Sequence, residues 1–224
     1  MSIEFGVDHL IVLVPDLEAA RAAFVSAGFS ATPLARHSEA SGTANTCIML
    51  PDTYIEIMGI VAETPASEGW QSLLDLGQGL RGIALRSTVI EETVAALSEK
   101  GFELEPFRRF SRTIPQGELR FSALRLPPGL TPGIQCIYCQ HYTPELVWSA
   151  DTLHHANGAK RIVAVTLPGS AALAALAGVD GHFLPVSEGQ EGSLTIAFDR
   201  DVSTQALAAI HRETGLRIEP VAIS

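Results

Sequence analysis

The chain has 224 residues, of which 46% are hydrophobic and 18% are charged, and its formal net charge is −10. This composition describes a folded protein of one large or two small domains, and the acidic charge argues against nucleic acid and anionic membranes as partners. No apolar run reaches the roughly 18 residues of a membrane span, and MSIEFGVDHL lacks the basic segment and cleavage site of a signal peptide. We therefore expect a cytoplasmic protein.

The first predicted unit is an apolar strand, HLIVLV, followed by an amphipathic helix. Asp16 is placed to cap this helix, and Gly28 stands where a left-handed C-terminal cap is favoured. The predicted buried stripe of the helix is Leu17, Ala20, Phe24 and Ala27. Three strand-like stretches follow, which are SATPLARH, NTCIMLP and TYIEIMGI.

Residues 61–79 link this unit to the next, and we expect a short helix there over Trp70–Leu76. The second unit starts with the strand GIALR and a helix for which Thr88 and Glu91 form a predicted capping box. Its buried stripe is predicted to be Ile90, Val94 and Leu97, and Gly101 ends it. The strand-like stretches ELEPFRRF, ELRFSALRLP and IQCIYCQHY complete the repeat, so each unit reads β-α-β-β-β.

Residues 160–224 follow a different order, β-α-β-β-α-β. This order is typical of a ferredoxin-like arrangement or of two shortened copies of the same unit. We expect two parts, a paired-unit domain at 1–150 with modules at 3–60 and 80–142, and a C-terminal segment at 151–224 packed on it.

The three cysteines are too few for a disulfide framework. Cys136 and Cys139, in CIYC, have the spacing of half a zinc ribbon, but no second such pair exists. We expect both to be small core residues on a strand, and Cys47 has no visible activating partner.

Polar residues in apolar surroundings are the candidates for function. His9 lies within the first strand, where a histidine is usually a core residue bonded to backbone, and Glu56 in YIEIM has the spacing of a solvent-facing residue. The loop ARHSEASGTAN places His37, Thr43 and Asn45 around a glycine. It is either a substrate-binding loop with His37 as donor or general base, or a turn bonded to its own backbone.

Other polar residues have weaker patterns. Arg86 points either into a cleft or to a surface carboxylate, and His155, beside the turn NG, either closes over a cleft or shapes the turn. The arginines of RRFSR are expected to pair with surface carboxylates such as Glu103 and Glu105. His154 is a weaker site candidate than His155, and His182 and His211 are expected on the surface.

The paired units resemble the vicinal oxygen chelate superfamily, which includes glyoxalase I, extradiol dioxygenases and bleomycin-resistance proteins. VDHLIVLVPDLEAARAAFVSAGF, RHSEASGTAN, TYIEIMGI, CQHYTPELVW and HANGA are together similar to the glyoxalase-like domain family within it. The resemblance covers nearly the whole chain and implies an α+β fold whose paired βαβββ modules form a half-open barrel.

The resemblance also implies metal ligands on the first and fourth strands of a module, which are His9 and Glu56 here. His141 is the candidate third ligand, because Gly82 stands opposite His9 in the second module and offers no side chain. This set suits zinc, iron, manganese or nickel, and a metal-free site is equally arguable. Such modules often pair between chains, so a homodimer is compatible with the sequence.

Two functions follow from the resemblance. One is a metal-dependent lyase, isomerase or dioxygenase acting on a small molecule, in which His37 or His141 moves the proton. Its substrate contacts are then Thr43, Asn45, Arg86 and His155. The alternative is a protein that binds and sequesters a small molecule without chemistry.

Overall fold

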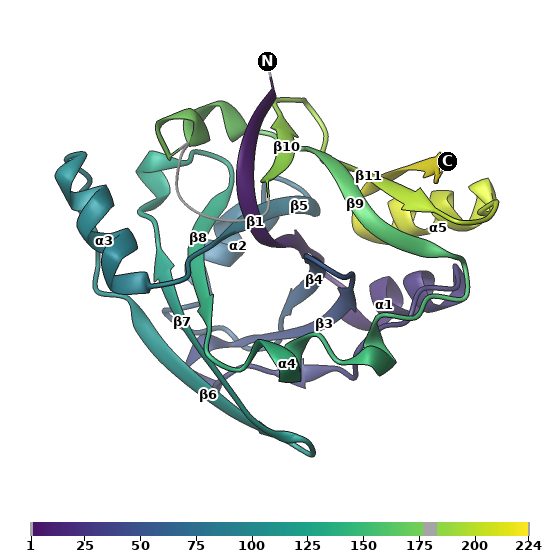
Figure 1. The fold of residues 1–224 in the computed structure, drawn as a ribbon, viewed down its shortest axis with the longest axis horizontal. Helices are drawn as coiled ribbons and strands as arrows, with labels where there is room; N and C mark the ends of the chain where they lie inside the picture. Colours follow the sequence, from purple (N-terminus) through teal and green to yellow (C-terminus); the bar gives the residue numbers. More distant parts are fainter. Residues whose placement is uncertain (1, 177–182, 224) are drawn as a thin grey trace.

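A computed structural model describes residues 2–176 and 183–223 (Figure 1). A curled sheet is formed by β1 (Ser2–Leu13), β2 (Ala35–Arg36), β3 (Thr43–Met49), β4 (Tyr54–Ile60), β5 (Gly79–Arg86), β6 (Arg108–Ile114), β7 (Gly117–Arg125) and β8 (Gln135–His141). The C-terminal strands are β9 (Ala159–Thr166), β10 (Phe183–Ser187), β11 (Ser193–Phe198) and β12 (Arg217–Ala222). The helices are α1 (Leu17–Ser26), α2 (Glu68–Leu74), α3 (Ile90–Glu99), α4 (Pro144–Val147) and α5 (Thr204–Thr214).

Two modules of the same design share the curled sheet. In the first, β1 pairs with β4 in parallel, and in the second, β5 pairs with β8 in parallel. An antiparallel ladder between β1 and β5 joins the two modules at the centre. The predicted α+β half-barrel of paired βαβββ modules is confirmed, although β2 is much shorter than the predicted strand SATPLARH.

The C-terminal strands continue from the first module through β1. Residues 2–6 of β1 pair with β10, whereas residues 9–13 pair with β4. Of the two predicted arrangements, the split ferredoxin-like one is wrong, because β9 and β10 are direct parallel neighbours and so are β11 and β12. A 3-10 segment at Ser170–Leu176 replaces the first predicted helix.

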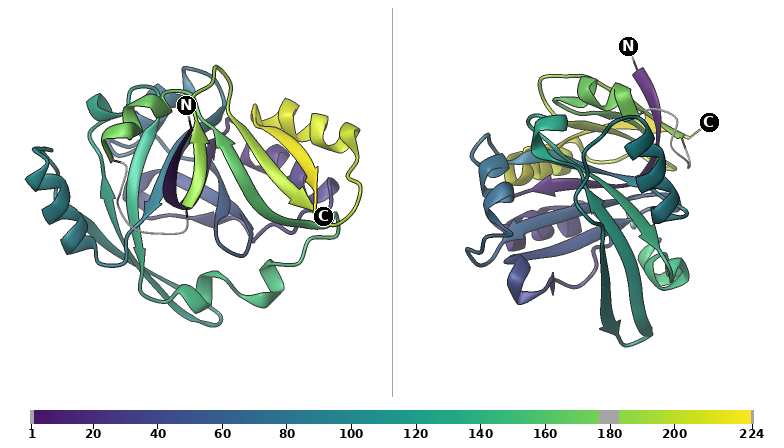
Figure 2. Two further views of the ribbon diagram at one scale, coloured as in Figure 1. Left: turned by 45° about the horizontal axis from the view of Figure 1, so that its top comes forward. Right: turned by 90° about the vertical axis from the view of Figure 1, so that its left-hand side faces the viewer.

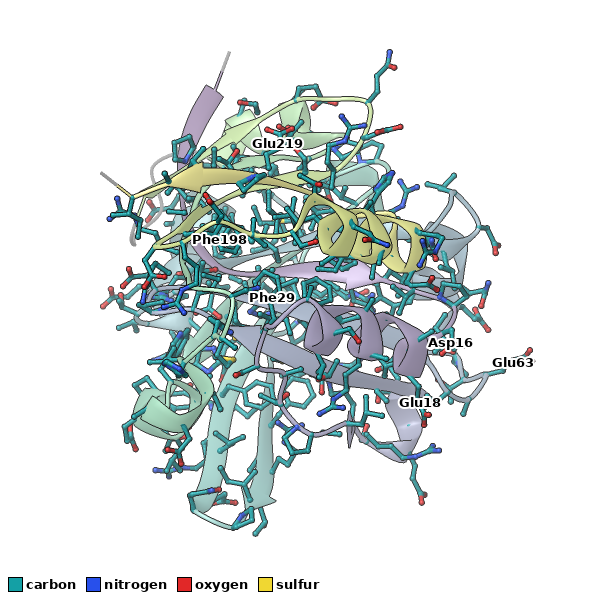
Figure 3. All side chains as sticks on the ribbon, turned by 90° about the vertical axis from the view of Figure 1, so that its right-hand side faces the viewer. Asp16, Glu18, Phe29, Glu63, Phe198 and Glu219 are labelled. Atoms are coloured by element: carbon teal, nitrogen blue, oxygen red, sulfur yellow. The ribbon has the colours of Figure 1, made fainter. Side chains whose placement is uncertain are left out.

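The convex side of the sheet carries the main core. Figure 3 shows α1 beside α5. Phe29, which follows α1, and Phe198, at the end of β11, pack in this core with 6.1 Å between their ring centroids. Asp16 accepts a hydrogen bond from the Ala19 amide at 2.9 Å, so the predicted cap of α1 is confirmed. Its predicted stripe is buried as well.

The start of α3 differs from the prediction. Its N-cap is Val89, which has no capping side chain, so the predicted capping box is wrong. The Gln140 amide of β8 takes over this role, because its Oε1 accepts from the Ile90 amide at 2.9 Å and its Nε2 donates to the Thr88 carbonyl at 2.7 Å. A residue far along the chain therefore caps this helix.

The concave side holds a second, smaller apolar cluster. Ile11, Leu13 and Met58 pack there against Trp70 of α2, the helix predicted in the linker. This cluster forms an apolar floor beside the polar residues described below. None of the helices in the described residues is long and apolar enough to cross a membrane.

Candidate functional site

A bulge in β1 places two consecutive polar side chains in one cluster. The pairing of β1 with β5 shifts register between Val7 and His9, which interrupts the strict alternation of the strand. Asp8 therefore turns towards the same group of residues as His9, and its Oδ1 lies 2.8 Å from His9 Nδ1. Sequence reasoning missed Asp8, because alternation assigns it to the face opposite His9.

Asp8 joins both modules. Its carboxylate, fully buried, contacts His141 Nε2 at 3.0 Å and Arg86 Nε at 3.1 Å in addition to His9. Burial raises the pKa of Asp8, but the hydrogen bonds from His141 and His9 outweigh burial and hold that pKa well below its usual range. Because an ionised carboxylate only accepts, the facing nitrogens of His9 and His141 each carry a proton.

Glu56 is the second carboxylate of the cluster. Asn45 Nδ2 donates to its Oε1 at 2.6 Å, and His37 Nε2 lies 3.5 Å from the same oxygen. Its Oε2 lies 3.5 Å from His9 Nε2. Burial raises the pKa of Glu56, but the hydrogen bond from His37 and the nearby charge of His9 outweigh burial and lower it to about 2.

His37 lies at the edge of the cluster. Its side chain is 28% exposed, whereas that of His9 is 6% exposed, so His37 is the imidazole that solvent reaches. Thr43 Oγ1 holds its Nδ1 at 2.7 Å. The loop predicted to bind substrate therefore uses Thr43 and Asn45 to orient His37 and Glu56.

Aromatic rings surround the imidazoles. His9 stacks on Tyr54 with 4.5 Å between ring centroids, and Trp148 lies edge-on to both Tyr54 and His141. The Arg86 guanidinium lies 5.2 Å from the centre of the Trp148 ring. These rings fix the orientation of the polar groups, and sequence reasoning missed them because nothing local marks Tyr54 or Trp148.

The profile of the glyoxalase-like domain family matches residues 7–180, which include this whole cluster. The chain belongs to the glyoxalase-like domain family. A crystal structure of a hypothetical protein from Staphylococcus aureus matches with a TM-score of 0.69 at 15% identity, covering 96% of this chain and 99% of that one. No curated protein matches the chain.

Smaller structures match part of this glyoxalase-like protein. Methylmalonyl-CoA epimerase from Streptomyces coelicolor, in complex with 2-nitronate-propionyl-CoA, matches with a TM-score of 0.48 at 18% identity, covering 62% of this chain and 96% of that one. A hypothetical protein from Bacillus halodurans gives a TM-score of 0.45 at 17% identity, covering 60% and 92%. These likenesses concern the fold alone.

The spacing of His9 and Glu56 fits two ligands of one metal ion. Two ligands about 2.1 Å from one ion at a tetrahedral angle lie about 3.4 Å apart. The 3.5 Å between His9 Nε2 and Glu56 Oε2 is close to this spacing. Asp8 fixes the other ring nitrogen of His9, which is the usual outer partner of a ligating histidine.

A second group of ligand atoms lies on the other side of His9. Atoms of Asp8, His9, Cys139 and His141 all lie within 4.8 Å of one another. Arg86 already neutralises Asp8, and burial raises the pKa of the Cys139 thiol well above its usual range. This side is therefore the poorer place for a cation.

The second module offers no ligand at the positions that match His9 and Glu56. Gly82 has no side chain to offer, and a Cβ there would be crowded, at 3.0 Å from the Gln135 carbonyl oxygen and 3.1 Å from Ile11. Gln135 pairs with Gly82 as Tyr54 pairs with His9, so Ile137, two residues later, takes the place of Glu56.

The remaining candidates lie outside the cluster. His155 is buried, accepts from the Ser30 amide at 3.0 Å through Nδ1 and donates to the Met49 carbonyl at 2.8 Å through Nε2. Burial lowers its pKa. His154 and His211 are exposed, and His182 lies outside the described residues.

The other sequence candidates have structural partners. Cys136 lies in the main core and Cys139 beside His141, so CIYC does not present two thiols to one ion. Arg109 of RRFSR pairs with Glu91 at 2.6 Å, which replaces the predicted partners Glu103 and Glu105.

Proposed function

We propose that this glyoxalase-like protein is a divalent-cation-dependent enzyme that moves a proton at a carbon next to a carbonyl or enolate oxygen of a small molecule. One observation carries the proposal. Asp8 Oδ1 accepts a hydrogen bond from His9 Nδ1 at 2.8 Å, so His9 Nε2 is turned towards the Glu56 carboxylate, 3.5 Å from Oε2. Two electron-rich atoms at this distance need a cation between them, either a proton or a metal ion.

The residues of the chain have separable roles in this proposal. His9 and Glu56 hold the cation, which when bound polarises the substrate oxygen and stabilises developing negative charge. His37 Nε2, fixed by Thr43 through Nδ1, takes or returns the proton, because it is the most exposed imidazole of the cluster. His141 stays hydrogen-bonded to Asp8 and lies beside the bound substrate.

An isomerase or lyase is favoured over a dioxygenase. The resemblance places the second metal-binding histidine of extradiol dioxygenases on the first strand of the second module. That position is Gly82 here, which has no side chain that could bind a metal ion and is crowded by the Gln135 carbonyl and Ile11.

Metal titration of chelator-treated protein tests the proposal. We expect Mn²⁺ or Zn²⁺ to bind with a stoichiometry of one, and His9→Ala and Glu56→Gln to abolish this binding. His154→Ala is the matched control, because that histidine is exposed. Loss of binding in Cys139→Ala, with binding retained in Glu56→Gln, would assign the cation to the other group and contradict the proposal.

A second candidate is a protein that binds a small molecule without turning it over. Ile137 in the place of Glu56 supports this candidate, since one module alone then supplies the cation ligands. Saturable ligand binding to a protein that takes up no divalent metal would favour it.

A further inference from the structure

Three arginines line the concave wall of the second module. On β8 the concave face is marked by Cys139 and His141, and the register places Arg125 of β7 opposite Ile137 on the same face. The pairing of β6 with β7 then continues this face through Arg108 and Arg112. Figure 2 shows the β6–β7 hairpin extending beyond the body of the molecule, so this wall is a projecting one.

Unpartnered buried donors gather on this wall. Within residues 2–176 and 183–223, four buried side-chain atoms have no hydrogen-bond partner, which are Arg112 Nε, Arg125 Nη2, Tyr138 OH and His141 Nδ1. Tyr138 lies in the main core, whereas the other three lie on the concave face. The two arginine atoms are permanent N–H donors, and two buried charged donors without a partner on one face point to a missing acceptor.

We propose that the substrate carries an anionic oxygen group, a carboxylate or a phosphate, and that Arg112 and Arg125 bind it. This assignment rests on the proposed function in one respect, which is that the substrate binds on the concave face that carries His9 and Glu56. Guanidinium groups suit such oxygens because their N–H donors are planar and permanently charged.

The surroundings of the two arginines hold their free N–H groups in place. Arg125 donates Nε to Gln135 Oε1 at 2.8 Å and lies 4.8 Å above the Trp70 ring, which leaves Nη2 for a ligand. Burial raises the pKa of the Cys47 thiol, and the nearby charge of Arg112 opposes this rise. Cys47 pairs with Glu56 across β3 and β4. The anionic group therefore lies across the concave face from the His9–Glu56 pair.

Calorimetric titration with matched compounds tests the proposal. Benzoate is compared with benzamide, and phenyl phosphate with phenol, in chelator-treated protein at constant ionic strength. We expect at least one anion to bind saturably and its neutral counterpart to bind at least about tenfold more weakly. The stronger of the two anions identifies the headgroup. No saturable binding of either anion, or equal binding of the neutral compounds, overturns the proposal.

Variants then locate the anion. Arg112→Gln is expected to weaken binding at least about tenfold, since one charge-assisted hydrogen bond is lost. Arg109→Gln on the same strand is the matched control, because that side chain pairs with Glu91 of α3 and should leave affinity unchanged. Arg125→Lys, which keeps the charge, is a second variant in case Arg112→Gln fails to fold. If Arg112→Gln or Arg125→Lys folds and binds the anion as tightly as the Arg109→Gln control does, the assignment of the anion to these arginines is overturned.

Two further variants separate this proposal from the proposed function. Glu56→Gln and His9→Ala should abolish metal uptake and retain anion binding. If metal uptake is absent but the arginine variants lose anion affinity, the proposed function fails and this one stands. If metal is taken up but the arginine variants keep full anion affinity, the proposed function stands and the anion site is rejected.

Discussion

The two modules share a backbone design but differ in the charge of their concave walls. The first contributes Glu56 with its partners His9, His37 and Asn45. The second places Ile137 where Glu56 would stand and contributes Arg112 and Arg125. Strand order and register are therefore the same in both modules. The concave wall of the first module carries a carboxylate with imidazoles, whereas that of the second carries guanidinium groups.

Asp8 lies at the boundary between these walls. It contacts His9 of its own strand, and Arg86 and His141 of the second module. A single buried carboxylate thus links both halves of the site, and its removal should affect the fold more than any other change considered below.

Asp8→Asn should lower the free energy of unfolding by about 3–5 kcal/mol, because it leaves Arg86 without its buried counter-charge. Urea denaturation at neutral pH measures this change. Asp151→Asn, at an exposed position, is the control and should have little effect. A loss no larger than the control would mean that Asp8 does not hold the two modules together.

Glu56 should make the fold sensitive to acid. Its pKa of about 2 in the folded protein lies below the ordinary value of 4.5, so its stabilisation is fully present above pH 4.5 and is lost as pH falls towards 2. The pKa difference corresponds to about 3 kcal/mol. Unfolding measured from pH 6 to pH 2 should therefore show a smaller loss in Glu56→Gln than in the wild type. The same pH dependence of stability in the variant and the wild type would contradict the lowered pKa of Glu56.

Gln140→Ala should destabilise the second module by about 2 kcal/mol, because the α3 N-terminus loses the side chain that bonds Ile90 and Thr88. Hydrogen exchange should show faster opening of α3 than of α1. Equal exchange in the variant and the wild type would show that the helix needs no cap from β8.

Asp16→Ala should have the smallest effect, a loss of about 1 kcal/mol from α1, because its cap is local and exposed. Thermal unfolding of this variant beside Gln140→Ala compares a local cap with a tertiary one. A larger loss of stability in Asp16→Ala than in Gln140→Ala would show that the local cap matters more than the tertiary one.

Much of the fold could be predicted from the sequence, because its signals are local. Helix periodicity and the glycines after each helix, Gly28 and Gly101, predicted the repeat, and both glycines have positive φ. The approach of His9 to Glu56 followed from the family resemblance. The predicted capping box is absent because the helix begins one residue later, with Val89 as its N-cap, and Gln140, fifty positions after Ile90, binds the Ile90 amide.

The rest of the site depends on contacts between distant strands. A bulge, which no pattern in β1 announces, decided that Asp8 joins His9 in one cluster. The register of β6, β7 and β8 decided that Arg112 and Arg125 lie on the concave face of the curled sheet, as Glu56 does. By itself the sequence determined the helices, the turns and the duplicated strand order, since neighbouring residues specify these. Only the tertiary structure decided which charges meet, because strand pairing joins residues that are far apart in the chain.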